Sequence, residues 1–312
     1  MPDIYIYSPS GAVRDRAAFR RGVKHLQQAG HRVTVDPAAL SRESRFAGSD
    51  EERLAAIGRV ARSGAQASLI SRGGYGLTRL LPDLPYAAIQ KSIDRGMAWV
   101  GFSDFTALQL AVLSRTGGIT WAGPALCDSF GGDPMDPEGV DEIADACFAD
   151  VLSGQGEGAG WRMGLAASRG LPGRKPGVWA RDAQLWGGNL TVLCSLLGTP
   201  FLPSIDGGVL FLEDVGEHPY RIERMLTQLL HAGVLARQKA IVLGQFTDYR
   251  LTPHDRGFGM PAVLSHLRAQ LKVPVLTDLP FGHVATRVCL PVGARVDLLV
   301  EGRDAMLVWG HI

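Results

Sequence analysis

Short apolar runs alternate with longer amphipathic segments along the first 125 residues. The apolar runs DIYIYSPS, HRVTVD, AQASLISRGGYG and GMAWVGFS have the pattern of strands. Apolar residues at helical spacing mark the segments 14–30, 49–64 and 104–117, and the second of these opens with Ser49 or Asp50 as its cap. Strands separated by helices of this length predict a parallel sheet with helices on both faces.

Residues 128–178 have a different character, because they are rich in glycine, proline and acid and hold one predicted helix at 140–152. We interpret them as a link between an N-terminal domain, 1–127, and a second domain, 179–312. Strands are predicted in the second domain at 208–215, 239–246, 287–300 and 305–311, and helices at 219–235 and 261–271. The second domain is therefore expected to be mixed, with a closing pair of strands.

Composition narrows the class of protein. The 312 residues carry a net charge of +1, which argues against nucleic acid as the main partner. The first residues, MPDIYIYSPSGAV, lack the basic and apolar stretches of a signal peptide, and no run approaches the ~18 apolar residues of a membrane helix. The four cysteines form no C-x-x-C pair, so neither a disulfide framework nor a thiolate zinc site is expected. These features predict a cytoplasmic protein that does not bind a membrane.

The stretch GFSD, residues 101–104, places Ser103 where a strand is predicted to end and a helix to begin. A sharp bend of this kind can expose a serine hydroxyl and direct helix N–H groups at an oxyanion. The stretch is not G-x-S-x-G, so the hydrolase elbow motif does not apply. The alternative interpretation is that Ser103 or Asp104 only caps the helix.

A glycine loop, RGGYG at 72–76, follows another predicted strand. Adjacent glycines let the backbone approach a ligand, and their N–H groups can face an anion. The loop matches neither G-x-G-x-x-G nor a phosphate loop, so nucleotide binding has little support. A tight turn and a cradle for an oxyanion or carboxylate are equally compatible with it.

Acidic side chains gather at 211–225, but H-E-x-x-H and the D-x-D calcium pattern are absent. Glu213 follows the apolar run GVLFL and is expected at the strand terminus, where it can orient a histidine. A solvated loop of acids is the alternative. Among the eight histidines, His283 in LPFGH is the one expected to face a cleft. Ser103, Glu213 and His283 together predict a triad in that order.

Several blocks resemble the L,D-carboxypeptidases of the serine peptidase S66 type. They extend over nearly the whole chain and comprise SPSG, RFAGSDEERL, RGGYGLTRLL, GFSDFTALQ, GP at 123–124, LWGGNLTVLCSLLGTP, GVLFLEDVGEHPYRIERML, LGQF, FGH and LPVG. The family's nucleophile falls on Ser103, its triad glutamate on Glu213 and its histidine on His283. Many members have H-G-P where this chain has Ala122, Gly123 and Pro124.

The resemblance implies a flavodoxin-like N-terminal domain and a smaller, β-rich swivelling-type C-terminal domain. It also implies a serine carboxypeptidase that removes the terminal D-alanine from muropeptide tetrapeptides in peptidoglycan recycling, without cofactor or metal, as a homodimer. Backbone N–H groups near Gly74 and Asp104 are expected to receive the oxyanion. An exopeptidase must also bind a terminal carboxylate, which suits arginine. The candidate substrate-binding residues are Arg72, Trp186, Arg221 and Arg224.

Three alternatives remain at this stage. One is an immunity-type peptidase of the same family that cleaves peptide–nucleotide antibiotics. Another is a non-catalytic sensor that binds muropeptides on the same fold. The third is a metallohydrolase built on the acidic run, which activity in excess chelator would exclude.

Overall fold

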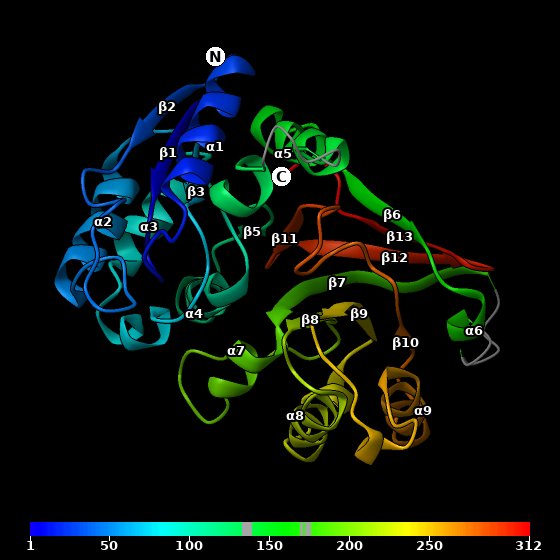
Figure 1. Cartoon of the computed structure of the whole chain (residues 1–312). Coiled ribbons are helices and arrows are strands. Elements are labelled where there is room, and N and C mark those ends of the chain that lie inside the picture. The colour runs from blue at the N-terminus through cyan, green and yellow to red at the C-terminus, as the bar shows by residue number, and fades with distance from the viewer. Residues whose placement is uncertain (133–138, 169–170, 172–175) are drawn as a thin grey trace. The chain divides into compact units, whose positions relative to one another are not determined.

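The computed structural model describes residues 1–132, 139–168, 171 and 176–312 (Figure 1). The chain forms two compact units, each made of separate stretches of sequence. The first unit comprises residues 1–156, 198–203 and 285–293, and the second comprises residues 157–197, 204–284 and 294–312.

The first unit is built on a six-stranded sheet. Five strands are parallel, in the order β2-β1-β3-β4-β5, and β11 pairs antiparallel with β5. The strands are β1 (Asp3–Tyr7), β2 (Arg32–Val35), β3 (Ala67–Ile70), β4 (Ala98–Gly101), β5 (Thr120–Ala122) and β11 (Leu290–Val292). The parallel order is that of flavodoxin-like sheets, which confirms the predicted fold class.

Helices cover both faces of this sheet (Figure 1). The chain passes from β1 to β2 on one side and then returns to β3, β4 and β5 on the other side of β1. Because crossovers between parallel strands are right-handed, this change of direction places α2, α3 and α4 on the face opposite α1. Accordingly α2, α3 and α4 pack in succession, while α1 packs on the turn at Leu126–Phe130. The helices are α1 (Arg16–Gln28), α2 (Asp50–Arg62), α3 (Tyr86–Ile93), α4 (Thr106–Thr116) and α5 (Glu142–Ser153). Ser49 caps α2 in a capping box with Glu52, so the first of the two predicted caps is the one used.

The second unit has a mixed sheet of seven strands in the order β10-β9-β8-β7-β12-β13-β6. The first four are parallel and the remaining pairings are antiparallel. The strands are β6 (Gly158–Arg162), β7 (Gly177–Asn189), β8 (Val209–Val215), β9 (Ala240–Thr247), β10 (Val275–Leu276), β12 (Arg295–Glu301) and β13 (Asp304–Val308). Three helices lie along one side of the parallel part, α7 (Leu190–Ser195), α8 (Pro219–His231) and α9 (Met260–Gln270), whereas α6 (Leu165–Ser168) is a single turn (Figure 1).

Two segments differ from the sequence prediction. The predicted strand 287–300 is two strands, because the chain turns at Gly293, whose φ of 103° suits glycine, and β11 and β12 join different sheets. The predicted link, 128–178, contributes α5 to the first unit and β6 to the second. The boundaries expected at residues 127 and 179 are thus not those of the compact units.

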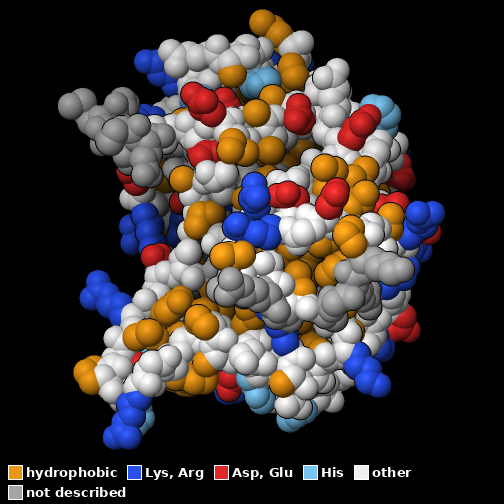
Figure 2. Space-filling view, turned by 90° about the vertical axis from the view of Figure 1, so that its right-hand side faces the viewer, with side chains coloured by type: hydrophobic (Ala, Val, Ile, Leu, Met, Phe, Trp, Pro, Cys, Tyr) orange, Lys and Arg blue, Asp and Glu red, His pale blue; other side chains and the backbone are white. Residues whose placement is uncertain are grey.

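Figure 2 shows one face of the molecule, on which acidic and basic side chains are interspersed with hydrophobic ones. This mixture agrees with the near balance of 32 basic and 31 acidic residues. Within the described ranges, no helix has both the length and the apolar character needed to cross a membrane.

Candidate active site

Ser103 lies just beyond β4, as the first residue of a single 3-10 turn, Ser103–Phe105, that leads directly into α4. Its φ is 64°, in the left-handed region that a serine rarely adopts. Backbone strain of this kind costs about 1–3 kcal/mol and is concentrated at functional sites. The capping interpretation is wrong here, because the N-caps of the two helices are Phe102 and Phe105, which supply no side-chain hydrogen bond.

The glycine loop after β3 passes directly against Ser103. A Cβ at Gly73 would lie 2.7 Å from the Cβ and 2.8 Å from the Oγ of Ser103, and 3.6 Å from the backbone nitrogen of Asp104. Only a residue without a side chain therefore fits at position 73. The glycine that faces Ser103 is Gly73, whereas the predicted Gly74 is the next residue and is exposed.

The side chain of Asp104 fixes this loop. Its buried carboxylate accepts a hydrogen bond from the backbone N–H of Leu77, at 2.9 Å. Burial raises the pKa of Asp104, against the opposing effect of this N–H and of Arg53 and Arg45 nearby. The residue after Ser103 thus holds the glycine loop in place, and its own backbone N–H remains the predicted oxyanion donor.

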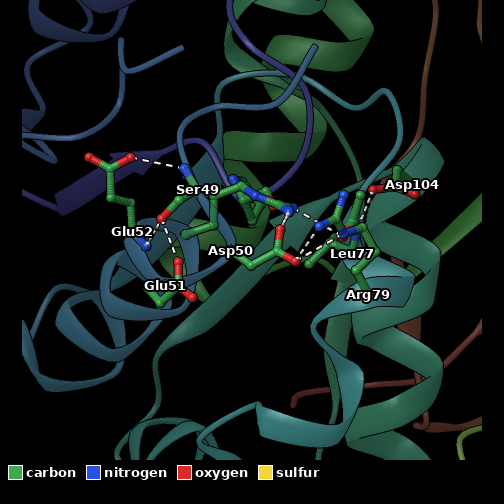
Figure 3. A network of polar contacts seen from close by, with 10 residues as sticks. Ser49, Asp50, Glu51, Glu52, Leu77, Arg79 and Asp104 are labelled. Carbon is green, nitrogen blue, oxygen red and sulfur yellow. Dashed lines mark hydrogen bonds and ion pairs between the residues drawn. The ribbon is translucent and has the colours of Figure 1, made fainter. Parts of the chain in front are cut away.

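Figure 3 shows Asp50 paired with Arg79, and Asp104 bonded to the N–H of Leu77. A buried arginine completes the support of the loop. Arg53 of α2 is fully buried and donates to the carbonyl oxygens of Pro9 and Gly76, at 2.9 and 3.0 Å. It also pairs with Asp50, which in turn accepts from Arg79. Two loops beyond the parallel strands are therefore tied to one helix, and the sequence prediction did not identify this role of Arg53.

Another buried arginine stabilises the bend itself. The guanidinium of Arg287 lies 3.7 Å from the ring centroid of Phe102, the residue before Ser103, and donates to the hydroxyl of Ser129 at 2.9 Å. A cation over an aromatic ring is attracted to its negative face. The bend that carries Ser103 is thus held through its side chains on both flanks, by Phe102 and by Asp104.

In the second unit, His283 and Glu213 form a hydrogen-bonded pair. Nδ1 of His283 lies 2.8 Å from Oε2 of Glu213, whose side chain is fully buried. A carboxylate at Nδ1 fixes the tautomer in which Nδ1 carries the proton and Nε2 is basic. Glu213 is not at the strand terminus, as expected from sequence, because β8 continues for two more residues. This geometry is suited to a histidine that accepts a proton at Nε2 while the carboxylate orients the ring.

Asn189, the last residue of β7, orients Glu213 and was not predicted from the sequence. Its amide donates to Oε1 of Glu213 and to Oδ1 of Asp214, both at 3.1 Å. Its amide oxygen accepts from the N–H of Val192 and so caps α7. An asparagine that follows Gly187 and Gly188 and precedes an apolar helical run has the sequence signal of an N-cap. Nothing in the sequence shows that its amide also binds Glu213.

The backbone conformation of Gly282, just before His283, allows the histidine to approach Glu213. Gly282 has a φ of 144°, and a Cβ there would lie 3.3 Å from the Cβ of Glu213. A side chain at this position would be strained in its backbone and would crowd the glutamate. The glycine of the FGH block thus lets the histidine loop approach β8.

The predicted substrate-binding residues occupy different surroundings. Arg72 is half-buried in the first unit, and burial together with the charge of Arg14 lowers its pKa. Arg221 is exposed on α8 and pairs with Glu217, and Arg224 is exposed on the same helix. Trp186 is a core residue with 1% exposure, and its ring nitrogen donates to Gln238 at 3.0 Å. The candidate substrate-binding residue Trp186 therefore packs in the core of the second unit.

Each unit contains a cavity of several hundred Å³. One of about 620 Å³ lies beside β9 and α9 in the second unit and contains none of the predicted site residues. One of about 440 Å³ lies in the first unit and is lined by Arg72 and Gly74, among others. Within the described residues, no group of three His, Cys, Asp or Glu side chains is placed to hold a metal ion.

Two protein-family models, several curated proteins and several solved structures match this chain. Residues 4–123 match the LD-carboxypeptidase N-terminal domain and residues 182–298 match the LD-carboxypeptidase C-terminal domain. The crystal structure of muramoyltetrapeptide carboxypeptidase from Oxalobacter formigenes is similar with a TM-score of 0.84 and 37% identity, covering 99% of this chain and 98% of that one. The murein tetrapeptide carboxypeptidase of Pseudomonas aeruginosa is 34% identical over 71% of this chain and 68% of its own length. The Microcin C7 self-immunity protein MccF of Escherichia coli is 26% identical over 95% of this chain and 90% of its own length. The chain belongs to the LD-carboxypeptidase family.

Proposed function

We propose that the protein is a serine carboxypeptidase that removes the terminal D-alanine from murein tetrapeptides by cleaving an L,D peptide bond. The observation that carries the proposal is the hydrogen bond between His283 and the buried Glu213, because it prepares a histidine as a general base. The strained backbone of Ser103, facing Gly73, supports the choice of nucleophile. The murein tetrapeptide carboxypeptidase of P. aeruginosa supports the choice of substrate.

The proposed reaction proceeds through an acyl-enzyme. Nε2 of His283 accepts the proton of the Ser103 hydroxyl while Oγ attacks the carbonyl carbon of the scissile bond, and Glu213 balances the charge of the imidazolium. The N–H groups of Gly74 and Asp104 donate to the oxyanion. His283 then returns the proton to the nitrogen of the leaving D-alanine, and water hydrolyses the ester. Arg72 holds the terminal carboxylate, since a half-buried guanidinium binds a carboxylate more strongly than an exposed one.

Release of D-alanine tests the proposal directly. L-Ala-γ-D-Glu-meso-diaminopimelyl-D-Ala is incubated with the wild-type protein in excess EDTA, and the Ser103→Ala and Ser195→Ala proteins serve as the test variant and its matched control. We expect release by the wild-type protein and by Ser195→Ala, whose serine is exposed on α7. Release by Ser103→Ala should fall by a factor on the order of 10⁴. Unchanged release by Ser103→Ala would contradict the assignment of the nucleophile.

The relationship to MccF favours one second candidate, an immunity-type peptidase that cleaves peptide–nucleotide antibiotics. Aspartyl sulfamoyl adenosine, the compound in one MccF crystal structure, provides the matched substrate. We expect a kcat/KM for the tetrapeptide that exceeds the value for this compound. A higher kcat/KM for aspartyl sulfamoyl adenosine than for the tetrapeptide would indicate that a nucleotide conjugate, and not a murein peptide, is the substrate. Stoichiometric binding of the tetrapeptide by the wild-type protein without any release would indicate a sensor.

The proposed cellular role is to trim tetrapeptides to tripeptides during peptidoglycan recycling in the cytoplasm, by a homodimer. A strain that lacks the protein should accumulate tetrapeptide fragments, and the wild-type gene should restore the tripeptides whereas the Ser103→Ala gene should not. Sedimentation of the purified protein tests the dimer, and a monomer with full activity would show that dimerisation is not needed.

A further inference from the structure

Four arginines line the 440 Å³ cavity of the first unit. The cavity is formed by three loops, at residues 11–14, 42–45 and 72–75, and its charged lining residues are Arg14, Arg42, Arg45 and Arg72. Among the residues that the structure describes, no acidic side chain belongs to the lining. A volume of several hundred Å³ is typical of sites for small molecules rather than for single ions.

Backbone hydrogen bonds join the three loops. The N–H of Gly11 donates to the carbonyl oxygen of Gly73, and the N–H of Ala12 donates to the carbonyl oxygen of Arg45 at 2.9 Å. The guanidinium of Arg45 lies 5.7 Å from the ring centroid of Tyr75, within the range of a cation–π contact. The arginines thus lie on loops that are hydrogen-bonded to one another, unlike arginines scattered over a surface.

The positive charge of the cavity is poorly compensated. Burial lowers the pKa of Arg72, and the charges of Arg14 and Arg45 lower it further, while Asp128 and Cys127 act in the opposite direction. Asp15, next to Arg14 in the chain, is used as the N-cap of α1. Four like charges in a lining without an acidic side chain oppose folding by self-repulsion, so the lining is the arrangement expected of a site that an anion completes.

The cavity is adjacent to the nucleophile loop. Gly74 belongs to its lining, and the preceding Gly73 is the residue that faces Ser103. The cavity and the candidate catalytic serine therefore lie against neighbouring residues of the same glycine loop. A single terminal carboxylate is satisfied by one bidentate guanidinium, for which Arg72 is assigned, so three arginines remain.

We propose that Arg14 and Arg45, assisted by Arg42, bind a second carboxylate of the peptide substrate, in addition to the C-terminal one. This inference rests on the proposed function and names its substrate class, peptides with an extra acidic group near the scissile bond. The tetrapeptide has two such groups, the α-carboxylate of its γ-linked glutamate and the distal carboxylate of its diaminopimelate.

Calorimetric titration of the Ser103→Ala protein tests the inference without turnover. The ligands are the tetrapeptide and two analogues, each with one of the two extra carboxylates converted to an amide. We expect one analogue to bind about tenfold more weakly than the parent, because it loses a charge-assisted hydrogen bond. Equal binding of all three peptides, within about twofold, would overturn the inference with every arginine in place.

Variants then locate the effect. In the Ser103→Ala background, Arg14→Gln with Arg45→Gln should reduce the difference between the parent and the sensitive analogue to about onefold, whereas Arg95→Gln, an exposed arginine in the turn after α3, should preserve it. Equal weakening of all three peptides by the double variant would overturn the inference. If the wild-type protein releases no D-alanine from any peptide, the proposed function fails, and the binding ratios still decide the inference.

Discussion

A Cβ at residue 73 would lie 2.7 Å from the Cβ of Ser103, so Gly73 and Ser103 occupy adjoining space that admits only one side chain. We expect Gly73→Ala to displace the serine from its position and to lower kcat/KM by about 100-fold or more, since small misplacements at a reacting group cost this much. The measurement is D-alanine release by the folded variant.

The control for this change is Gly160→Ala in β6, where the nearest atom to an added Cβ is 3.8 Å away. It should leave kcat/KM within about twofold, because the methyl group meets only ordinary contacts. An active Gly73→Ala protein would show that the loop adjusts and that the close approach has no role in catalysis.

The backbone strain at Ser103 predicts that two substitutions of this residue differ in stability. Ser103→Gly should raise the free energy of unfolding by about 1 kcal/mol relative to Ser103→Ala, because glycine adopts a φ of 64° without steric cost. Both variants should lose activity. Urea denaturation of the two proteins gives the comparison.

Arg256→Gly is the matched control, since Arg256 is exposed and has a φ of 46° far from any predicted site residue in the chain. It should gain a similar amount of stability and keep its activity. If Ser103→Gly is no more stable than Ser103→Ala, the backbone of Ser103 is not strained.

Asn189 is expected to act as a positioning residue through Glu213. Asn189→Ser keeps an N-cap for α7 but removes the amide that donates to Oε1 of Glu213. We expect kcat to fall about tenfold with KM nearly unchanged, because the change acts on the base and not on substrate contacts.

Asp15→Ser makes the corresponding cap substitution at α1 and should leave kcat unchanged. If Asn189→Ser loses stability but keeps its kcat, Asn189 acts only as the N-cap of α7. Glu213→Gln provides the upper limit of the effect, since it removes the charge that balances the imidazolium, and should lower kcat by a factor on the order of 10⁴.

The pair between Asp36 and Arg59 predicts acid sensitivity of the first unit. Burial alone would raise the pKa of Asp36, but hydrogen bonds from Arg59, the N–H of Ala38 and the Tyr5 hydroxyl outweigh it, so the pKa lies below its ordinary 3.8. A carboxyl group with a lowered pKa stabilises the fold above its unfolded pKa, and this contribution is lost as the pH falls through the folded value.

We therefore expect Asp36→Asn to lower the free energy of unfolding by about 2 kcal/mol at pH 7 and by progressively less below pH 4. Urea denaturation between pH 7 and pH 3 measures the difference. Asp83→Asn, at an exposed aspartate, should have no effect at either end. A constant difference across this range would show that Asp36 acts through packing and not through its charge.

Much of the architecture was predictable because the local patterns agree with the tertiary contacts. Apolar runs that alternate with capped helices predicted the parallel sheet, and the polar residues after those runs included Ser103, Glu213 and His283. The prediction failed where a residue's role depends on a distant partner. Nothing near Gly73 in sequence shows that this residue lies against Ser103, and the partner of Asn189 is 24 residues away.

Trp186 shows a different limit of sequence reasoning. A tryptophan next to two glycines is equally compatible with a ligand pocket and with a core, and the continuous burial of residues 185–189 at the end of β7 decides for the core. The segment 287–300 was taken as one strand because its apolar residues are nearly continuous, and only the two sheets of the fold separate β11 from β12.

The placement of β11 has a consequence for synthesis of the chain on the ribosome. The sheet of the first unit is complete only when residues 290–292 pair with β5, although β5 itself ends at residue 122. At usual elongation rates, β5 emerges about 10 to 30 s before its partner strand, with an unpaired edge of N–H and C=O groups. The nascent chain therefore carries a strand edge that is open to misplaced pairing throughout synthesis of the second unit.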